Sequence, residues 1–276
     1  MKKTIFLFLL IAFSSSQGLA WGPKGHQVVG DVARAHLSDA ARKNVIALLG
    51  NDDLAAVSVW ADDIKSQRPE SYGWHFVDIQ KSSTGFSQPR DCYQPNEKYP
   101  YSMTDHHNCV VDRINMFRDV LANKNAPQQD RIDALKFLVH FVGDIHQPLH
   151  AIDEARGGND IHVVEFGSPQ CGTRLCNLHY EWDIGLLEHT GRSEADYVAY
   201  VQQLAKSNHL DTRAGGTPED WANESFNIAR KVLIKDGGAV DEEYYKNNIG
   251  TVDERLALAG LRLAKLLNDT LGEPKP

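Results

Sequence analysis

The sequence predicts a mainly α-helical protein, a single-domain helical bundle with long loops and at most a small β-hairpin. Apolar side chains recur at helical spacing through most of the chain, which is typical of amphipathic helices. Runs with strand character are short and few, and neither an internal repeat nor a low-complexity linker divides the 276 residues. A chain of this length suits one sizeable domain.

Seven helices are expected in chain order. Residues 28–36 carry apolar side chains at i, i+3 and i+4, which indicates one buried helix face. Ser38 or Asp39 is expected to cap a second helix, and Gly50 to end it. Five later segments repeat the helical pattern: 108–121, 130–145, 193–207, 217–234 and 247–271. Strand character is limited to 74–79 and 160–166, which are short runs with β-branched or aromatic residues.

The first twenty residues have the features of a secretory signal peptide. Lys2 and Lys3 precede the apolar run 5–13, and a small-residue stretch ends at Ala20. The apolar run is shorter than the roughly 20 residues that span a bilayer, which argues against the alternative of a retained anchor. We therefore expect cleavage after Ala20, one catalytic domain over 21–276, a periplasmic or extracellular location and no membrane anchor in the mature protein.

Four cysteines, an even number, fit an oxidising compartment. They are Cys92, Cys109, Cys171 and Cys176. Of the three possible pairings, we predict Cys92 with Cys109 and Cys171 with Cys176, because these close the shortest loops. A cysteine-rich zinc site is the alternative, but no C-x-x-C spacing supports it.

The charge of the chain is acidic, with 37 Asp and Glu against 29 Lys and Arg. Such a balance is unfavourable for wrapping duplex nucleic acid, which is held largely by Lys and Arg at phosphates. A phosphate substrate would therefore need positive charge from another source, of which bound metal is the most direct.

The segment His140 to His150 has the strongest chemical signal. His140 and Asp144 are four residues apart, so on a helix they project from one face. Pro148 breaks that helix, which lets His150 turn back toward the same place. His146 has a different offset and is expected to point elsewhere. Histidine with a carboxylate at this spacing predicts a metal site.

A second pair, His179 and Asp183, repeats the i, i+4 spacing. Helix capping by Asn177 is an alternative reason for the acid, although it does not explain the histidine. Asp62 in Trp-Ala-Asp and His75 in Trp-His-Phe are weaker candidates on their own. Imidazole nitrogen together with carboxylate oxygen is a ligand mixture suited to zinc.

These motifs together resemble the S1/P1 nuclease family. The ordered set is Trp-Gly-x-x-Gly-His from Trp21, Trp-Ala-Asp, Trp-His-Phe, His-Phe-x-Gly-Asp with Gln-Pro-Leu-His, Gly-Gly-Asn, and Asn-Leu-His-x-x-Trp-Asp. The match covers essentially the whole chain from Trp21, and the order is specific although the tripeptides are not. The resemblance implies a helical fold shared with zinc-dependent phospholipase C, and three zinc ions.

The resemblance also implies how nine residues share the three ions. The first zinc would be bound by Asp62, His75, His140 and Asp144. The second would be bound by His150, His179 and Asp183. The third would be bound by the α-amine and carbonyl of Trp21, by His26 and by Asp144. The alternative for Trp21 is an ordinary buried aromatic residue.

The implied reaction is attack on phosphorus by a metal-activated water, giving 5′-phosphate ends, together with 3′-nucleotidase activity. Asp62 and Asp144 are catalytic through the metals, and Lys65 would place a cation beside the phosphate. Arginine stands at that position in family members, and lysine lacks its planar bidentate donor. The alternative for Lys65 is a solvated surface lysine.

Substrate contacts are assigned from the same resemblance. Phe76 would stack on a base and Asp78 would accept from a base edge, while Asn159 belongs to a loop near the site. Phe76 as a core residue is the alternative. The expected substrates are single-stranded DNA, RNA and 3′-nucleotides, and we expect a monomer.

Two other functions compete with the nuclease. A zinc-dependent phospholipase C would share the fold and metals, but the relatives that cleave phospholipids place glutamate as the last ligand of the second zinc, where this chain has Asp183. A non-catalytic zinc protein would be expected to lack ligands, and all nine positions are filled.

Overall fold

The computed structural model describes residues 21–92 and 108–273, and the predicted signal segment lies outside them. The described part is mainly helical, as predicted, with strands of only two or three residues. None of its helices is both long and apolar enough to pass through a bilayer.

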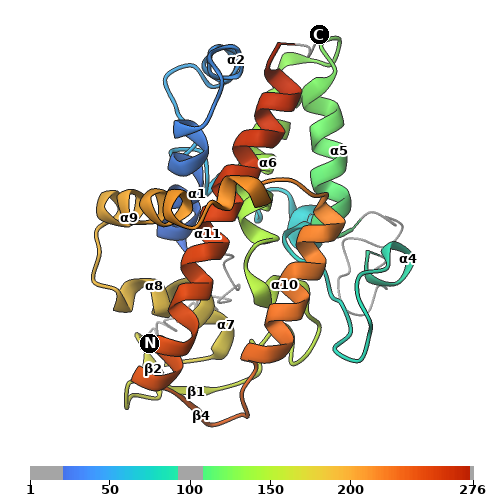
Figure 1. Cartoon of the computed structure of the whole chain (residues 1–276). Coiled ribbons are helices and arrows are strands. Elements are labelled where there is room, and N and C mark those ends of the chain that lie inside the picture. The colour runs from blue at the N-terminus through green and yellow to red at the C-terminus, as the bar shows by residue number, and fades with distance from the viewer. Residues whose placement is uncertain (1–20, 93–107, 274–276) are drawn as a thin grey trace, which may run out of the picture.

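The longest helix, α11 (Glu242–Leu271), forms the axis of a bundle. It packs against α1 (Pro23–Ala35), α5 (Val110–Ala122), α6 (Gln128–Asp144) and α9 (Glu194–Ser207). In Figure 1, α11 runs through most of the height of the molecule, with α9 crossing it on one side and α5, α6 and α10 (Pro218–Val232) on the other. Residues 256–264 of this helix are buried, so its second half forms much of the core of the bundle.

The shorter elements connect this bundle and carry most of its polar loops. They are α2 (Asp39–Leu49), α3 (Trp60–Asp63), η1 (Pro69–His75), α4 (Gln88–Asp91), η2 (Pro148–Ala151), α7 (Leu178–Tyr180), η3 (Glu181–Gly185), α8 (Leu186–His189), η4 (Leu210–Arg213) and α10 (Pro218–Val232). The element η3 is a single π-helical turn, a distortion that is frequent at functional sites. As predicted, Ser38 caps α2 through its side chain and Gly50, with φ of 68°, follows its last residue.

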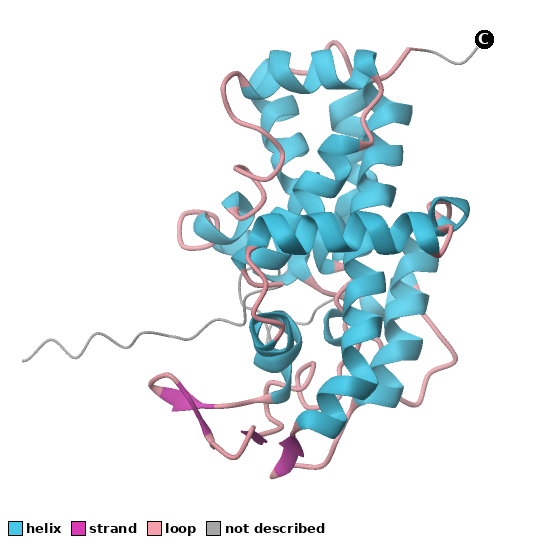
Figure 2. Cartoon of the chain, turned by 60° about the vertical axis from the view of Figure 1, so that its left-hand side comes forward, coloured by secondary structure: helices cyan, strands magenta, loops and turns pink. Residues whose placement is uncertain are grey.

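The strands gather at one end of the bundle (Figure 2). β1 (Val163–Glu165) pairs in parallel with β4 (Gly238–Val240), while β2 (Gln170–Cys171) and β3 (Arg174–Leu175) form a small antiparallel hairpin. The strand predicted over 160–166 is therefore present in part. The strand predicted over 74–79 is wrong: η1 extends to His75, and the extended residues after it make only isolated bonds, such as Val77 N to the His150 carbonyl at 2.8 Å.

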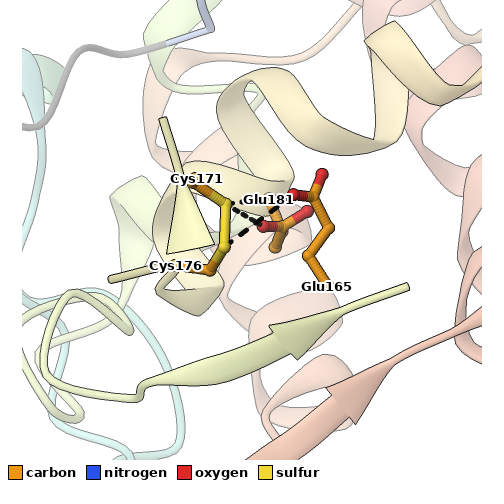
Figure 3. A group of neighbouring side chains, drawn as sticks. All are labelled: Glu165, Cys171, Cys176 and Glu181. Atoms are coloured by element: carbon orange, nitrogen blue, oxygen red, sulfur yellow. Dashed lines mark hydrogen bonds between the residues drawn. A yellow bond between two sulfur atoms is a disulfide. The ribbon is translucent and has the colours of Figure 1, made fainter. Parts of the chain in front are cut away.

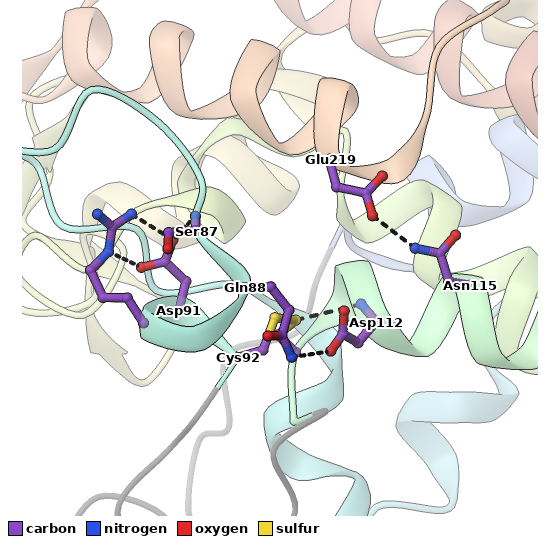
Figure 4. The surroundings of a disulfide bond; sticks show 9 residues. Ser87, Gln88, Asp91, Cys92, Asp112, Asn115 and Glu219 are labelled. Atoms are coloured by element: carbon purple, nitrogen blue, oxygen red, sulfur yellow. Dashed lines mark hydrogen bonds and ion pairs between the residues drawn. A yellow bond between two sulfur atoms is a disulfide. The ribbon is translucent and has the colours of Figure 1, made fainter.

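Both predicted disulfides are present. Cys171–Cys176 closes the β2–β3 hairpin (Figure 3), and Cys92–Cys109 ties α4 to the start of α5 (Figure 4). Beside Cys92–Cys109, the Gln88 amide donates to the Asp112 carboxylate at 2.9 Å, and this hydrogen bond also joins α4 to α5. The described cysteines are all bonded.

A buried ionic network fixes the turn 145–147 that follows α6. Arg255 and Arg262 of α11 are almost fully buried, and both pair with Glu224 of α10 at 2.7 Å. Arg255 Nε donates to the His146 carbonyl at 3.1 Å, and Arg262 Nη1 lies 2.9 Å from His146 Nε2. His146 is thus a structural residue that points away from the metal ligands, as its offset predicted.

A glycine where α1 packs against the turn before α3 provides a test of the packing. A Cβ on Gly30 of α1 would lie 2.8 Å from backbone atoms of Ala55 and Leu54, whereas a Cβ on Gly250 of α11 would meet nothing within 4 Å. We expect Gly30→Ala to lower the free energy of unfolding by about 1–3 kcal/mol through overpacking. Gly250→Ala, the matched control, should raise it by about 0.5–1 kcal/mol. Urea unfolding measures both, and equal shifts would contradict this packing.

Candidate metal centre

The first group of polar residues lies at the end of α6. His140 and Asp144 project from one face of this helix, as their spacing predicted, and meet Asp62 of α3 and His75 of η1. His75 Nδ1 and His140 Nε2 lie 3.0 and 3.3 Å from Asp144 Oδ2, and 3.7 and 3.5 Å from Asp62 Oδ1. Two imidazole nitrogens and two carboxylate oxygens therefore face one another over a few ångströms.

The second group combines η2 with the distorted helical turn after α7. His179 Nε2 lies 3.3 Å from Asp183 Oδ2, and His150 Nε2 lies 3.8 Å from Asp183 Oδ1. The capping alternative for this segment is also realised, because the Asn177 side chain accepts from the Tyr180 amide at 2.8 Å. Capping starts the helix, while its histidine and aspartate turn toward His150.

The third group connects α1 to the first. His26 Nε2 lies 3.4 Å from Asp144 Oδ1, so the two oxygens of Asp144 face different histidines. Trp21 is fully buried, and its indole Nε1 donates to the Gly143 carbonyl at 2.9 Å. The amide of Gly22 donates to the Asp183 carbonyl at 2.8 Å, which holds the backbone beside Trp21 between the other two groups.

Three of the histidines share one orientation. In His140, His150 and His179, the ring Nδ1 lies 2.7–2.9 Å from a backbone carbonyl. Those carbonyls belong to Ser58, His75 and Gly157, respectively. A proton held on Nδ1 by such a carbonyl leaves Nε2 with a free lone pair, which is the usual arrangement of metal-binding histidine.

The electrostatics of the groups call for a cation. Burial lowers the pKa of His26 to about 4, and that of His75 and of His179 to about 3. Burial would also lower the pKa of His140, but the charges of Asp144 and Asp62 outweigh it and raise that pKa to about 10. The two carboxylates therefore favour positive charge at His140, and a metal ion bound there would supply it.

Unpaired atoms support the same conclusion. Asp144 Oδ1, His150 Nε2 and both ring nitrogens of His26 are buried without a hydrogen-bond partner. A buried polar atom left unpaired costs about 1–3 kcal/mol, so several such atoms among the predicted ligands indicate that a ligand binds there. The residues present fit divalent metal in donor type, orientation and spacing.

Lys65 is a buried residue, which excludes the solvated alternative. It is 7% exposed, its Nζ lies 2.6 Å from Asp62 Oδ1, and it stands over the ring of Tyr72 at 5.8 Å from the centroid. The i, i+3 spacing from Asp62 on the same short helical segment places this cation directly beside the first group.

The structure gives less information on the predicted substrate residues than on the predicted metal ligands. Phe76 and Asp78 are both half-buried on the segment that follows His75, so neither the core nor the stacking alternative is excluded for Phe76. The Asn159 side chain donates to the Arg156 carbonyl at 2.9 Å within its own loop. A substrate role for these three residues stays a prediction.

Three residues orient the predicted ligands in ways that the sequence did not predict. Gln147 is buried, and its amide donates to Asp183 Oδ1 at 2.5 Å while its own oxygen accepts from the Leu149 amide. Its position between Asp144 and His150 is the signal that could have suggested this orienting role. The backbone carbonyls of Ser58 and Gly157 carried no signal, because only the tertiary fold brings them to the histidines.

A helical bundle that gathers buried imidazoles and carboxylates around a lysine has the construction of a metal-dependent hydrolase.

A sequence model described as S1/P1 Nuclease matches residues 21–272. The chain is 29% identical to Endonuclease 2 of Arabidopsis thaliana over 296 residues, which cover 97% of this chain and 96% of that protein. It is 26% identical to Nuclease S1 of Aspergillus oryzae over 285 residues, covering 92% and 93% of the two chains. It is 27% identical to Nuclease P1 of Penicillium citrinum over 280 residues, covering 91% and 98%.

The chain therefore belongs to the S1/P1 nuclease family and is a phosphodiesterase that acts on nucleic acid. Both the mainly helical fold and the enzyme class agree with the resemblance found in the sequence.

Proposed function

We propose that the chain is a secreted, zinc-dependent endonuclease that cleaves single-stranded DNA and RNA to 5′-phosphate products and also acts on 3′-nucleotides. The observation that carries this proposal is the set of three buried imidazole–carboxylate groups, two of which share Asp144 while the third is built on Asp183. Secretion is supported by the basic and apolar start of the chain and by the two disulfides.

We assign three zinc ions to the three groups. The first would be held by Asp62, His75, His140 and Asp144, the second by His150, His179 and Asp183, and the third by Trp21, His26 and Asp144. When bound, zinc supplies positive charge for the phosphoryl oxygens and acidity for the attacking water.

The protein's own residues prepare this site for a phosphate. The backbone carbonyls hold the histidines in one tautomer, and Gln147 holds the Asp183 carboxylate in place. Lys65 adds a cation next to Asp62, in a position to pair with a phosphate oxygen. Phe76 offers a ring for stacking that is indifferent to base identity, which suits single strands because their bases are free.

The deciding experiment compares substrates and metals. Mature protein is assayed on single-stranded DNA and on phosphatidylcholine, and its zinc content is measured. We expect turnover of DNA, about three zinc ions per chain and loss of activity on chelation that zinc restores. Turnover of lipid but not of DNA would show that the protein is a phospholipase C and not a nuclease. Asp183 and the family match disfavour this outcome.

Lys65→Ala is expected to lower kcat about 10²–10³-fold, the usual cost of removing one stabilising donor from a transition state. Zinc content should not change, since lysine is not among the predicted ligands. Lys65→Arg should recover part of the loss. Lys81→Ala, an exposed lysine paired with Glu154, is the matched control and should leave kcat unchanged.

A further inference from the structure

A second cluster of metal-ligating side chains lies at the strand end of the bundle, apart from the nine predicted zinc ligands. Glu165 ends β1, Cys171 and Cys176 close the β2–β3 hairpin, and Glu181 begins the π turn η3. Figure 3 shows both carboxylates turned toward the disulfide. Cys171 Sγ lies 3.1 Å from Glu165 Oε2 and 3.4 Å from Glu181 Oε1, and Cys176 Sγ lies 3.8 Å from Glu165 Oε2.

The Glu181 carboxylate of this cluster is poorly satisfied while the disulfide is intact. A disulfide sulfur carries no hydrogen, so these close contacts provide no donor. Glu181 is 0% exposed and its Oε2 has no hydrogen-bond partner. A Cβ on Gly185 would lie 2.0 Å from that oxygen and 3.4 Å from Glu165 Oε1, so both acids face the space that this glycine leaves open. Among the described residues, neither acid forms an ion pair with Arg174, whose guanidinium instead stacks on Tyr180.

We propose that reduction of Cys171–Cys176 turns this cluster into a closed zinc site with two thiolate and two carboxylate ligands. One ligand atom from each of the four side chains already lies within 4.8 Å of all the others. Zinc bonds of about 2.0–2.3 Å in a tetrahedron place ligand atoms roughly 3–4 Å apart, which matches the observed sulfur–oxygen distances. The two bonded sulfurs have to separate, and thiolate with carboxylate suits zinc better than calcium or magnesium.

The chemistry balances with a dithiol or phosphine as the reductant. The reductant supplies two electrons, the S–S bond breaks, and each sulfur takes one proton to become a thiol. When zinc binds, both thiols release their protons to solvent. A dithiol ends as its own disulfide, and a phosphine ends as the phosphine oxide after reaction with water.

The consequence is a hairpin that is closed in either redox state, by a covalent bond when oxidised and by a metal ion when reduced. Glu181 stands between His179 and Asp183 in the sequence, so its tether also helps to fix the turn that carries the second group of predicted zinc ligands. The competing outcome is a metal-free dithiol in which the two thiols merely donate to the carboxylates.

Cobalt absorption tests the proposal separately from nuclease function. Thiolate ligation of Co²⁺ gives a ligand-to-metal charge-transfer band, and none of the nine predicted catalytic ligands contains sulfur. The band therefore reports on cysteine alone, whether or not the proposed function is correct. Folded full-length mature protein is reduced with a phosphine and titrated with Co²⁺. We expect the absorbance of this band to saturate when one Co²⁺ ion per chain is bound by the cysteines, and the band to disappear when Zn²⁺ is added.

Matched variants locate the site. Cys92→Ser with Cys109→Ser should keep the band, and Cys171→Ser with Cys176→Ser should abolish it. Glu181→Gln should weaken Co²⁺ binding at least tenfold, and Glu165→Gln, at a half-buried position, gives the same test if Glu181→Gln does not fold. Absence of the band in the reduced parent, its survival without Cys171 and Cys176, or unchanged affinity in the folded glutamine variants would overturn the proposal.

Discussion

Replacement of Asp144 by asparagine is expected to abolish most nuclease activity, by well over 100-fold. Its two oxygens face His26 on one side and His75 with His140 on the other, so one substitution disturbs two predicted metal sites. Loss of a residue that only orients a ligand typically costs about 10–100-fold, and a shared ligand should cost more. Activity on single-stranded DNA and zinc content measured on the same sample should fall together, with fewer than three ions retained.

The matched control for Asp144→Asn is Asp63→Asn, an exposed acid next to the predicted ligand Asp62. It changes the net charge equally but should leave zinc content and activity near those of the parent. If Asp144→Asn kept three zinc ions and full activity while remaining folded, the bridging assignment would be wrong. Thermal unfolding separates this case from simple loss of the fold.

The helices of the bundle could be predicted from local pattern because their buried faces repeat at helical spacing. The segment predicted as 130–145 is α6, with ends within two residues. The last helix was predicted from 247 but begins at Glu242, because Asp241 caps it by accepting from the amides of Glu243 and Tyr244. Its first turns are largely exposed, and only Tyr244, Tyr245 and Ile249 pack on the core there, so periodicity alone did not include them.

The candidate site was predictable where its geometry is local and not where it depends on tertiary contacts. The i, i+4 pairs on α6 and across α7 face their partners as the spacing required. By contrast, the burial of Lys65, and the position of the Gly157 carbonyl behind His179, depend on how separate segments meet. The aromatic and β-branched run 74–79 suggested a strand, but no strand within residues 21–92 and 108–273 pairs with it, and its first residues form the end of η1. The cluster around Glu181 was also not predicted, because the sequence does not show which buried acid lacks a donor.

The start of the mature chain provides the other large expected effect. Trp21 is fully buried, and its indole donates to the carbonyl of Gly143, the residue before Asp144, so we expect its backbone nitrogen near the third group of predicted ligands. An α-amine nitrogen is available to metal only after the bond to Ala20 has been cut. We therefore expect protein that begins at Trp21 to bind three zinc ions. Protein with one extra alanine before Trp21 should bind two zinc ions and lose at least about 100-fold in activity, because loss of a ligand should cost more than loss of a residue that only orients one.

A substitution of the side chain distinguishes this role from that of an ordinary buried aromatic residue. Trp21→Phe at the mature start keeps the amine but loses the indole bond to the Gly143 carbonyl, so it should lower stability by about 1–3 kcal/mol while keeping three zinc ions. The extended protein should show the opposite result, with the indole bond kept and the third ion lost. Both proteins are compared with the parent by metal analysis, urea unfolding and turnover of single-stranded DNA. Three ions and full activity in the extended protein would leave Trp21 as a core residue only, and the third zinc would then need a different ligand.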